Sequence, residues 1–250
     1  MSGLTNLRTE SLPPIIIALI IGLGAVLVLE LAIPHVIASR LENAIRSSVD
    51  SVDCVRVQLR SFPAINLISY GKVKSVSMNC RGLLIEGLRI ESLMVDASDI
   101  LIDMQALRDE SRFSLSHVGQ GRAELVISQD DLNRYVNVLK GVPKSVLVEL
   151  SPGRVSIKGD VSVAGIDIPV SLDGEFVADQ NGTRLSYEVK NIHLGGARLP
   201  SIIRDGLMRG LDFSLDMSSL PIPVIISEIN MEDGIVRIVG RTPDDTGEST

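Results

Sequence analysis

Hydrophobic residues follow successive patterns along this chain, and the first is a continuous apolar run. Residues 15–33 carry one charge, Glu30, near the end of that run. A helix of this length extends roughly 28 Å, which is close to the roughly 30 Å hydrocarbon core of a bilayer. After the run, apolar residues recur at helical spacing to about Ser48. We therefore expect one long helix whose first part spans a membrane and whose second part is amphipathic.

A two-residue period, which is typical of half-buried strands, begins near residue 54. Its phase slips between Ile90 and Leu93, as a β-bulge would produce. The dipeptides Asn-Gly at 181–182 and Asp-Gly at 233–234 are typical of hairpin turns. The strands that we expect cover residues 54–60, 72–80, 88–95, 112–127, 146–150, 155–163, 166–177, 184–192, 224–229 and 235–239.

Two shorter amphipathic helices are expected among these strands. The first begins with a capping-box-like sequence at 128–131, in which Asp takes the place of Glu, and it ends before Gly141 and Pro143. The second covers about residues 199–211. Their apolar stripes consist of Leu132, Tyr135, Val136 and Leu139 in the first helix and Leu199, Ile202, Ile203 and Leu207 in the second.

This mixture indicates an α+β fold, with a mostly antiparallel sheet of long strands and three amphipathic helices. No linker rich in Pro, Gly or Ser divides the strand-rich region, so we expect it to form one domain. The expected organisation is a short N-terminal tail at 1–14, a transmembrane anchor at 15–33, the domain at 34–240 and a disordered acidic tail at 241–250.

The apolar run has the features of an uncleaved anchor rather than those of a cleaved secretory signal. Only Arg8 and the amino group, set against Glu10, precede it, and no A-x-A cleavage sequence follows it. The run is also longer than the roughly 7–15 residues of a signal core. The flanking charges do not encode orientation, because Arg8 precedes the run and Arg40 and Arg46 follow it.

The charge balance argues against a nucleic-acid partner. The chain carries 24 Lys and Arg against 31 Asp and Glu, a formal net charge of −7, and it contains no Trp. A nucleic-acid surface requires a basic patch, and binding of single strands relies on aromatic side chains for stacking. We therefore expect no nucleic-acid binding and no basic patch for docking on a membrane.

The sequence contains no catalytic or metal-binding motif that we recognise. His35, His117 and His193 lie far apart, and no cysteine pair has zinc spacing, so we interpret the histidines as surface or loop residues. Asp130 and Asp131 are adjacent acids in a first helical turn, where capping and the helix dipole explain them better than acid–base chemistry. We therefore expect no enzyme activity, no catalytic residue, no metal and no cofactor.

Cys54 and Cys80 are a candidate disulfide if the domain lies outside the cytoplasm. Their phases disagree, because Cys54 lies in phase with the polar residues Arg56 and Gln58, whereas Cys80 shares the phase of Val76 and Met78. Adjacent strands form a bridge only from one face, so this disulfide requires a bulge that resets the phase.

Several segments, in this order and spacing, resemble the LmeA-like family of bacterial envelope proteins. They are FPAINLISYGKV at 62–73, followed by the strand of Val76 and Met78, GLLIEGLRI at 82–90, VISQDDLN at 126–133, LPIPV at 220–224 and EDGIVRIVG at 232–240. The resemblance implies phospholipid binding outside the cytoplasmic membrane and a tubular lipid-binding fold, in which a long curved antiparallel sheet wraps around the helices. It supplies no catalytic motif. The chain departs from the family in the anchor, which we expect to remain uncleaved.

We therefore expect the main domain to be extracytoplasmic. Its expected partners are phospholipid or another acyl lipid and the cytoplasmic membrane. The wall of an elongated apolar cavity would then include both helix stripes and the inward residues Val76, Met78, Leu88 and Ile90. A solid core has the same hydrophobic pattern, so a tethered structural or partner-binding module remains an alternative, as does a hydrolase with an unrecognised site. The sequence encodes neither the identity of the lipid nor the oligomeric state.

Overall fold

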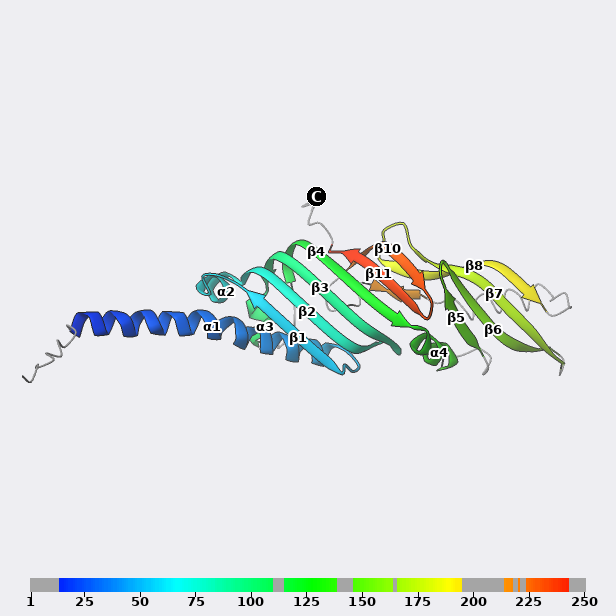
Figure 1. Cartoon of the computed structure of the whole chain (residues 1–250), viewed down its shortest axis with the longest axis horizontal. Coiled ribbons are helices and arrows are strands. Elements are labelled where there is room, and N and C mark those ends of the chain that lie inside the picture. Colours follow the sequence, from blue (N-terminus) through cyan, green and yellow to red (C-terminus); the bar gives the residue numbers. More distant parts are fainter. Residues whose placement is uncertain are drawn as a thin grey trace, which may run out of the picture.

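Helix α1 (Pro14–Ser48) forms one end of an elongated molecule whose remainder is built on two antiparallel β-sheets (Figure 1). This computed structural model describes residues 14–109, 115–138, 146–163, 166–194, 214–217, 220 and 224–242. Helix α1 runs unbroken past residue 33 and ends at Ser48, as the sequence predicted. The expected tails lie almost entirely outside the described residues.

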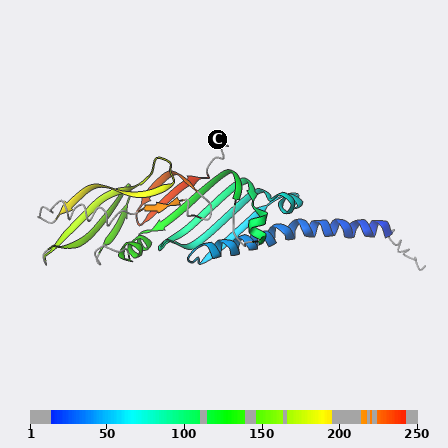
Figure 2. The same ribbon diagram turned by 180° about the vertical axis from the view of Figure 1, so that it is seen from behind.

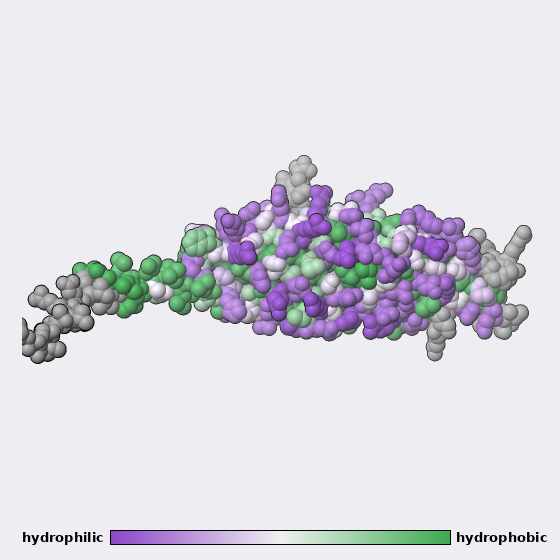
Figure 3. Space-filling view, viewed as in Figure 1, coloured by the Kyte–Doolittle hydropathy of each residue, from purple (hydrophilic) through white to green (hydrophobic). Residues whose placement is uncertain are grey.

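Helix α1 passes from an exposed to a buried environment along its length. Leu27 and Leu31 are exposed, whereas Leu41 and Ile45 are each only 1% exposed. Figure 3 shows the apolar first part projecting from a domain whose surface is mainly polar. The helix is long and apolar enough to cross a membrane, a test that a signal sequence near an N-terminus also passes. Because only 6% of its most apolar window is buried, this part of α1 is not a core helix of the domain.

The first sheet contains six strands in the order β1-β2-β3-β4-β11-β10. Each strand is antiparallel to its neighbours, and β11 returns from the C-terminal part of the chain to pair with β4. The strands are β1 (Cys54–Arg60), β2 (Lys72–Ile85), β3 (Leu88–Ile102), β4 (Leu115–Ser128), β10 (Ile225–Glu232) and β11 (Ile235–Arg241).

The second sheet has five strands in the order β5-β6-β7-β8-β9, again all antiparallel. The expected α+β fold with curled antiparallel sheets is confirmed, and the strands divide between two sheets instead of forming one. Those of the second sheet are β5 (Leu147–Ser151), β6 (Arg154–Val163), β7 (Ile166–Ala178), β8 (Arg184–Leu194) and β9 (Ser214–Asp216).

Strands β2 and β3 change the phase of their buried positions at matched points. On β2 the alternation of buried residues shifts by one position between Cys80 and Leu83. On β3 it shifts in the same way between Ile90 and Leu93. Leu83 pairs with Ile90 and Cys80 with Leu93, so the register between the strands is unchanged. The predicted slip is therefore confirmed, but it is not the predicted bulge, because no extra residue enters the pairing. Gly82, at a φ of 61°, supplies the backbone conformation that β2 needs at this point.

Within the described ranges, three short helices accompany the sheets: α2 (Ile65–Tyr70), α3 (Met104–Asp109) and α4 (Gln129–Val138). The sequence predicts one helical turn at residues 66–69, which lies within α2, and this turn and the helix expected at α4 are confirmed, whereas α3 was not predicted. Helix α4 lies between the two sheets in both ribbon views (Figures 1 and 2). The helix expected at 199–211 lies outside the described residues.

Cys54 and Cys80 are free thiols, which corrects the candidate disulfide. Val55, and not Cys54, is the residue opposite Cys80 in the pairing of β1 with β2. Cys54 is exposed and Cys80 is fully buried, so the two side chains project from opposite faces. The alternation of polar and apolar residues, which placed Cys54 and Cys80 in different phases, therefore predicted their arrangement correctly.

One apolar cluster extends from the second half of α1 through both sheets. Backbone hydrogen bonds join two turns of the second sheet to strand β10 of the first. The Gly153 N–H donates to the Met231 carbonyl (3.3 Å), and the Ile226 N–H donates to the Gly182 carbonyl (2.8 Å). The inner faces of the two sheets are therefore parts of a single interior.

Candidate functional site

The strand residues predicted to wall a lipid cavity all lie on the inner face of the first sheet. Val76 and Met78 on β2 are 7% and 2% exposed, and Leu88 and Ile90 on β3 are 1% and 0% exposed. All four belong to the cluster that continues into the second sheet. The structure thus brings these residues to one apolar interior, where protein encloses them.

The first predicted helix stripe reaches the same interior from α4, which packs against β3. Leu132 and Val136 are buried, and Tyr135 is half-buried beside the β2–β3 turn. Burial raises the pKa of the Tyr135 hydroxyl, and Glu86 adds to that shift. The other predicted residues, Leu139 of this stripe and Leu199, Ile202, Ile203 and Leu207 of the second, lie outside the described residues.

Helix α4 is fastened to the open edge of β5 by three amide side chains spaced four residues apart. Asn133 makes the central contact: its Nδ2 donates to the Val148 carbonyl (2.9 Å) and its Oδ1 accepts from the Val148 N–H (2.7 Å). On either side, Gln129 Oε1 accepts from the Leu150 N–H (2.8 Å), and Asn137 Nδ2 donates to the Val146 carbonyl (3.1 Å). This amide ladder holds the second sheet against the helix.

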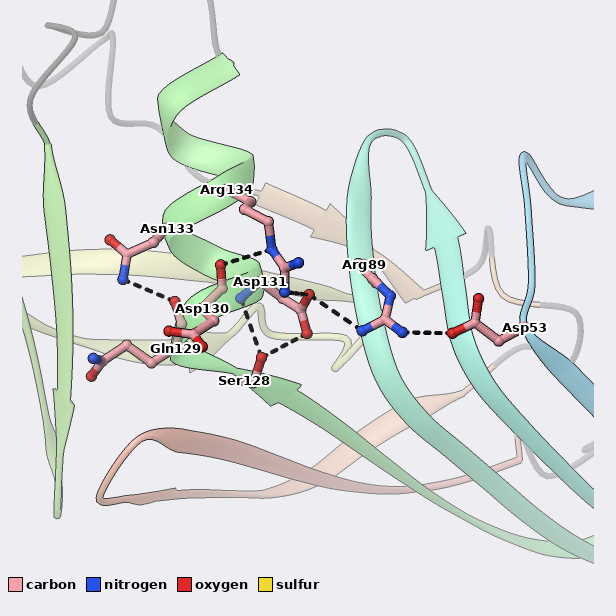
Figure 4. A network of polar contacts seen from close by, with 8 residues as sticks. All are labelled: Asp53, Arg89, Ser128, Gln129, Asp130, Asp131, Asn133 and Arg134. Atoms are coloured by element: carbon pink, nitrogen blue, oxygen red, sulfur yellow. Dashed lines mark hydrogen bonds and ion pairs between the residues drawn. The ribbon is translucent and has the colours of Figure 1, made fainter.

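Asp131 lies at the centre of a charged network that fastens α4 to the first sheet (Figure 4). Its carboxylate accepts from Ser128 Oγ at 2.6 Å and from Arg134 Nη2 at 2.7 Å, and Arg89 Nη1 lies 3.6 Å away. Arg89 also pairs with Asp53 at 2.6 Å, an interaction that raises the pKa of its guanidinium. The Asp131 side chain is 1% exposed, and paired cations compensate for such burial. The helix start predicted at 128–131 is confirmed, because Ser128 Oγ accepts the Asp131 N–H at 3.2 Å, whereas the Asp131 carboxylate binds side chains and not a backbone N–H.

Two acidic residues of α1 bind the open edge of β1 and the start of α2. Glu42 Oε1 accepts from the Val57 N–H at 2.8 Å, and Glu30 Oε2 accepts from the Ala64 N–H at 2.7 Å. The second contact draws α2 to the end of the domain from which α1 projects (Figure 1). Glu30, the one charge in the apolar run, thus has a structural partner in the domain.

A groove of about 640 Å³ lies between α1 and β1, and Glu30 is among the residues that line it. Its walls are mainly apolar, and two cations, Arg60 and Lys74, also contribute to them. The residues that line it are Leu27, Glu30, Leu31, Pro34, His35 and Ala38 from α1, residues 57–62 from β1 and its end, and Lys74 from β2.

Two further depressions lie on the first sheet. One, of about 430 Å³, adjoins the groove through Phe62 and Lys74 and includes His117. The other, of about 640 Å³, is lined largely by polar side chains of β1 to β4, among them Asp96 and Arg122. Within the described residues, no three His, Cys, Asp or Glu side chains gather as a metal site requires.

A family model described as LmeA-like phospholipid-binding matches residues 28–241. The chain belongs to this family. The match begins in the last turns of the apolar run and ends in β11, so it spans the groove, α4 and both sheets. The resemblance drawn from the sequence motifs is therefore confirmed, and the family is defined by lipid binding rather than by catalysis. Neither the curated proteins nor the solved structures contain a match to this chain.

The groove was not predicted from the sequence, although one signal pointed toward it. An acid at position 30 is costly in an apolar segment unless it has a partner, and that partner proved to be a backbone amide of the following domain. Arg60 and Phe62 gave no comparable signal, because their meeting with α1 depends on how the helix docks against β1.

Proposed function

We propose that this protein is a single-pass, membrane-anchored phospholipid-binding protein whose domain lies outside the cytoplasmic membrane. In this proposal, residues 15–33 cross the bilayer, and the domain receives acyl chains in an elongated apolar space along its inner face. Phospholipid handling or transfer within the envelope would be its task.

The continuous apolar interior is the observation that carries this proposal. It begins beside α1 and continues through both sheets, as an acyl chain would require. Each methylene moved from water into such surroundings contributes about 0.8 kcal/mol. Membership of a phospholipid-binding family supports the same conclusion.

The acyl chains would contact the inward residues of β2, β3 and α4, namely Val76, Met78, Leu88, Ile90, Leu132, Tyr135 and Val136. In the same proposal, Leu139, Leu199, Ile202, Ile203 and Leu207 complete the wall. Met78 supports this role, because its flexible thioether side chain adapts to chains of differing shape.

A tethered structural or partner-binding module is the second candidate, and close packing favours it. Met78, Ile90 and Leu132 are each at most 2% exposed, as in a filled core. The proposed lipid site therefore requires the wall to part when a chain enters.

The test is to purify the full-length protein in mild detergent, extract it with organic solvent and identify the lipids by mass spectrometry. We expect phospholipid in a defined ratio to protein, retained after washing with excess detergent. An unrelated single-pass protein prepared in parallel measures the lipid that any membrane helix carries. Equal lipid content in the two preparations would favour the structural module.

A further inference from the structure

The groove between α1 and β1 is placed where a bilayer lipid would meet the domain. Leu27 and Leu31 on its helical wall belong to the segment that we propose crosses the membrane, whereas Leu59 and Phe62 belong to the domain. Phe62 is 83% exposed, although large apolar side chains are usually buried. In the proposed topology, one end of the groove therefore lies beside the bilayer.

The two hydrogen bonds from α1 define the length of the groove. Glu42 holds β1 at Val57, and Glu30 holds the chain at Ala64, and the groove lies along residues 57–62 between these two contacts. Pro34 lies between the two acids and has no N–H, which leaves the Glu30 carbonyl without its usual helical donor. At about 640 Å³, the space falls within the roughly 300–1,000 Å³ typical of small-molecule sites.

The charges of the groove suit a phosphate group. Arg60 and Lys74 both line it, and within the described part of the chain neither of them forms an ion pair. The acid among the lining residues is Glu30, whose Oε2 already accepts the Ala64 N–H. Two cations beside an apolar wall complement a molecule that combines a phosphate with hydrocarbon chains.

We propose that this groove is the site where a phospholipid of the surrounding bilayer first binds. Its phosphate lies between Arg60 and Lys74, and one acyl chain lies against Leu31, Leu59 and Phe62. From there the chain passes toward the inner face of the first sheet. This step rests on the proposed function, because a groove that admits lipid has a role only if the domain binds lipid.

A single tryptophan makes binding at the groove measurable, because the chain contains no Trp. Phe62→Trp places the fluorophore in the groove with a conservative change of an exposed ring. The full-length variant, freed of lipid in mild detergent, is titrated with phosphatidylcholine that carries bromine on its acyl chains. We expect saturable quenching. Leu147→Trp, at an exposed apolar position on β5 outside the proposed lipid wall, is the control and should be quenched little.

Charge variants in the Phe62→Trp background then test the proposed phosphate contacts. Arg60→Gln with Lys74→Gln removes both cations of the groove. Arg56→Gln with Arg81→Gln removes two exposed cations from the same strands, β1 and β2, at positions that do not line it. We expect the first pair to weaken the apparent affinity roughly tenfold and the second to change it less than about twofold.

The outcomes separate this proposal from the function on which it rests. If wild type carries phospholipid but both charge pairs titrate alike, the groove is not the site and the function stands. If wild type binds no phospholipid at all, the function fails and the groove proposal fails with it. Excess inorganic phosphate should not displace the brominated lipid, because the acyl contacts remain. Complete displacement would identify a simple anion site and overturn the proposal.

Discussion

Asn133 offers the sharpest test of how the two sheets are held together. Its amide satisfies both backbone groups of Val148, a residue that is 2% exposed on the edge strand β5. Asn133→Ala removes both partners and leaves the Val148 N–H and carbonyl buried without hydrogen bonds. The cavity left by the amide is small, so the loss of these bonds should dominate the effect.

The magnitude follows from the two groups left unpaired. Each buried polar group without a partner costs about 1–3 kcal/mol. Alanine recovers about 0.5 kcal/mol through its higher helix propensity. We therefore expect the free energy of unfolding to fall by about 3 kcal/mol, which corresponds to a fall in Tm of roughly 6–12 °C for a domain of this size.

The assay is thermal and urea unfolding of the full-length protein in detergent, followed by circular dichroism. Asn137→Ala is the matched control, because Asn137 makes one contact to β5, with the Val146 carbonyl, from an exposed position that water reaches. It should cost less than about 1 kcal/mol. Equal losses in the two variants would refute the view that Asn133 is the main fastening between α4 and the second sheet.

Three further predictions concern the anchor, the thiols and the kink in β2. If residues 15–33 remain as an anchor, the full-length protein should stay with membranes through a carbonate wash, and a soluble chain starting near residue 33–40 would contradict this. In intact cells a membrane-impermeant maleimide should label Cys54 and not Cys80, whose pKa is raised to about 11 chiefly by burial. Labelling that requires lysis would contradict the proposed side of the membrane, and labelling that survives Cys54→Ser would contradict the burial of Cys80. Gly82→Ala should destabilise by up to about 1 kcal/mol more than Gly153→Ala, since both have positive φ but only at Gly82 would a Cβ push the Asp53 carboxylate away from Arg89; equal effects would mean that the ion pair contributes nothing measurable.

Local patterns predicted most of the individual elements, because each depends on neighbours in sequence. The apolar run and the stripe after it gave α1 to its last residue, and alternation gave nearly every strand. The capping sequence at 128–131 gave the start of α4, where Ser128 Oγ accepts the Asp131 N–H at 3.2 Å. Even the phase slip between Ile90 and Leu93 was visible, although its matched partner on β2 was not recognised.

Long-range arrangement was not predicted, because it depends on contacts that leave little local trace. The return of β11 to pair with β4 divides the strands into two sheets, and no alternation pattern encodes that choice. The candidate site likewise has a part that the sequence predicted and a part that it did not. Burial of Val76, Met78, Leu88 and Ile90 followed from their phase, whereas the groove arises only when α1 docks beside β1.

The outer strands β1 and β5 present a common problem that the chain solves with helices. An open strand edge exposes unpaired N–H and carbonyl groups and invites pairing with another chain. Side chains of α4 bind the edge of β5 at three successive points, so that little of it remains open. Among the described residues, helix α1 hydrogen-bonds to the edge of β1 through Glu42, whereas Glu30 binds the start of α2, and the groove lies between these two contacts. A helix needed only to cover an edge would have no reason to leave such a gap beside Arg60 and Lys74, so the difference between the two edges favours a binding role for the gap at α1.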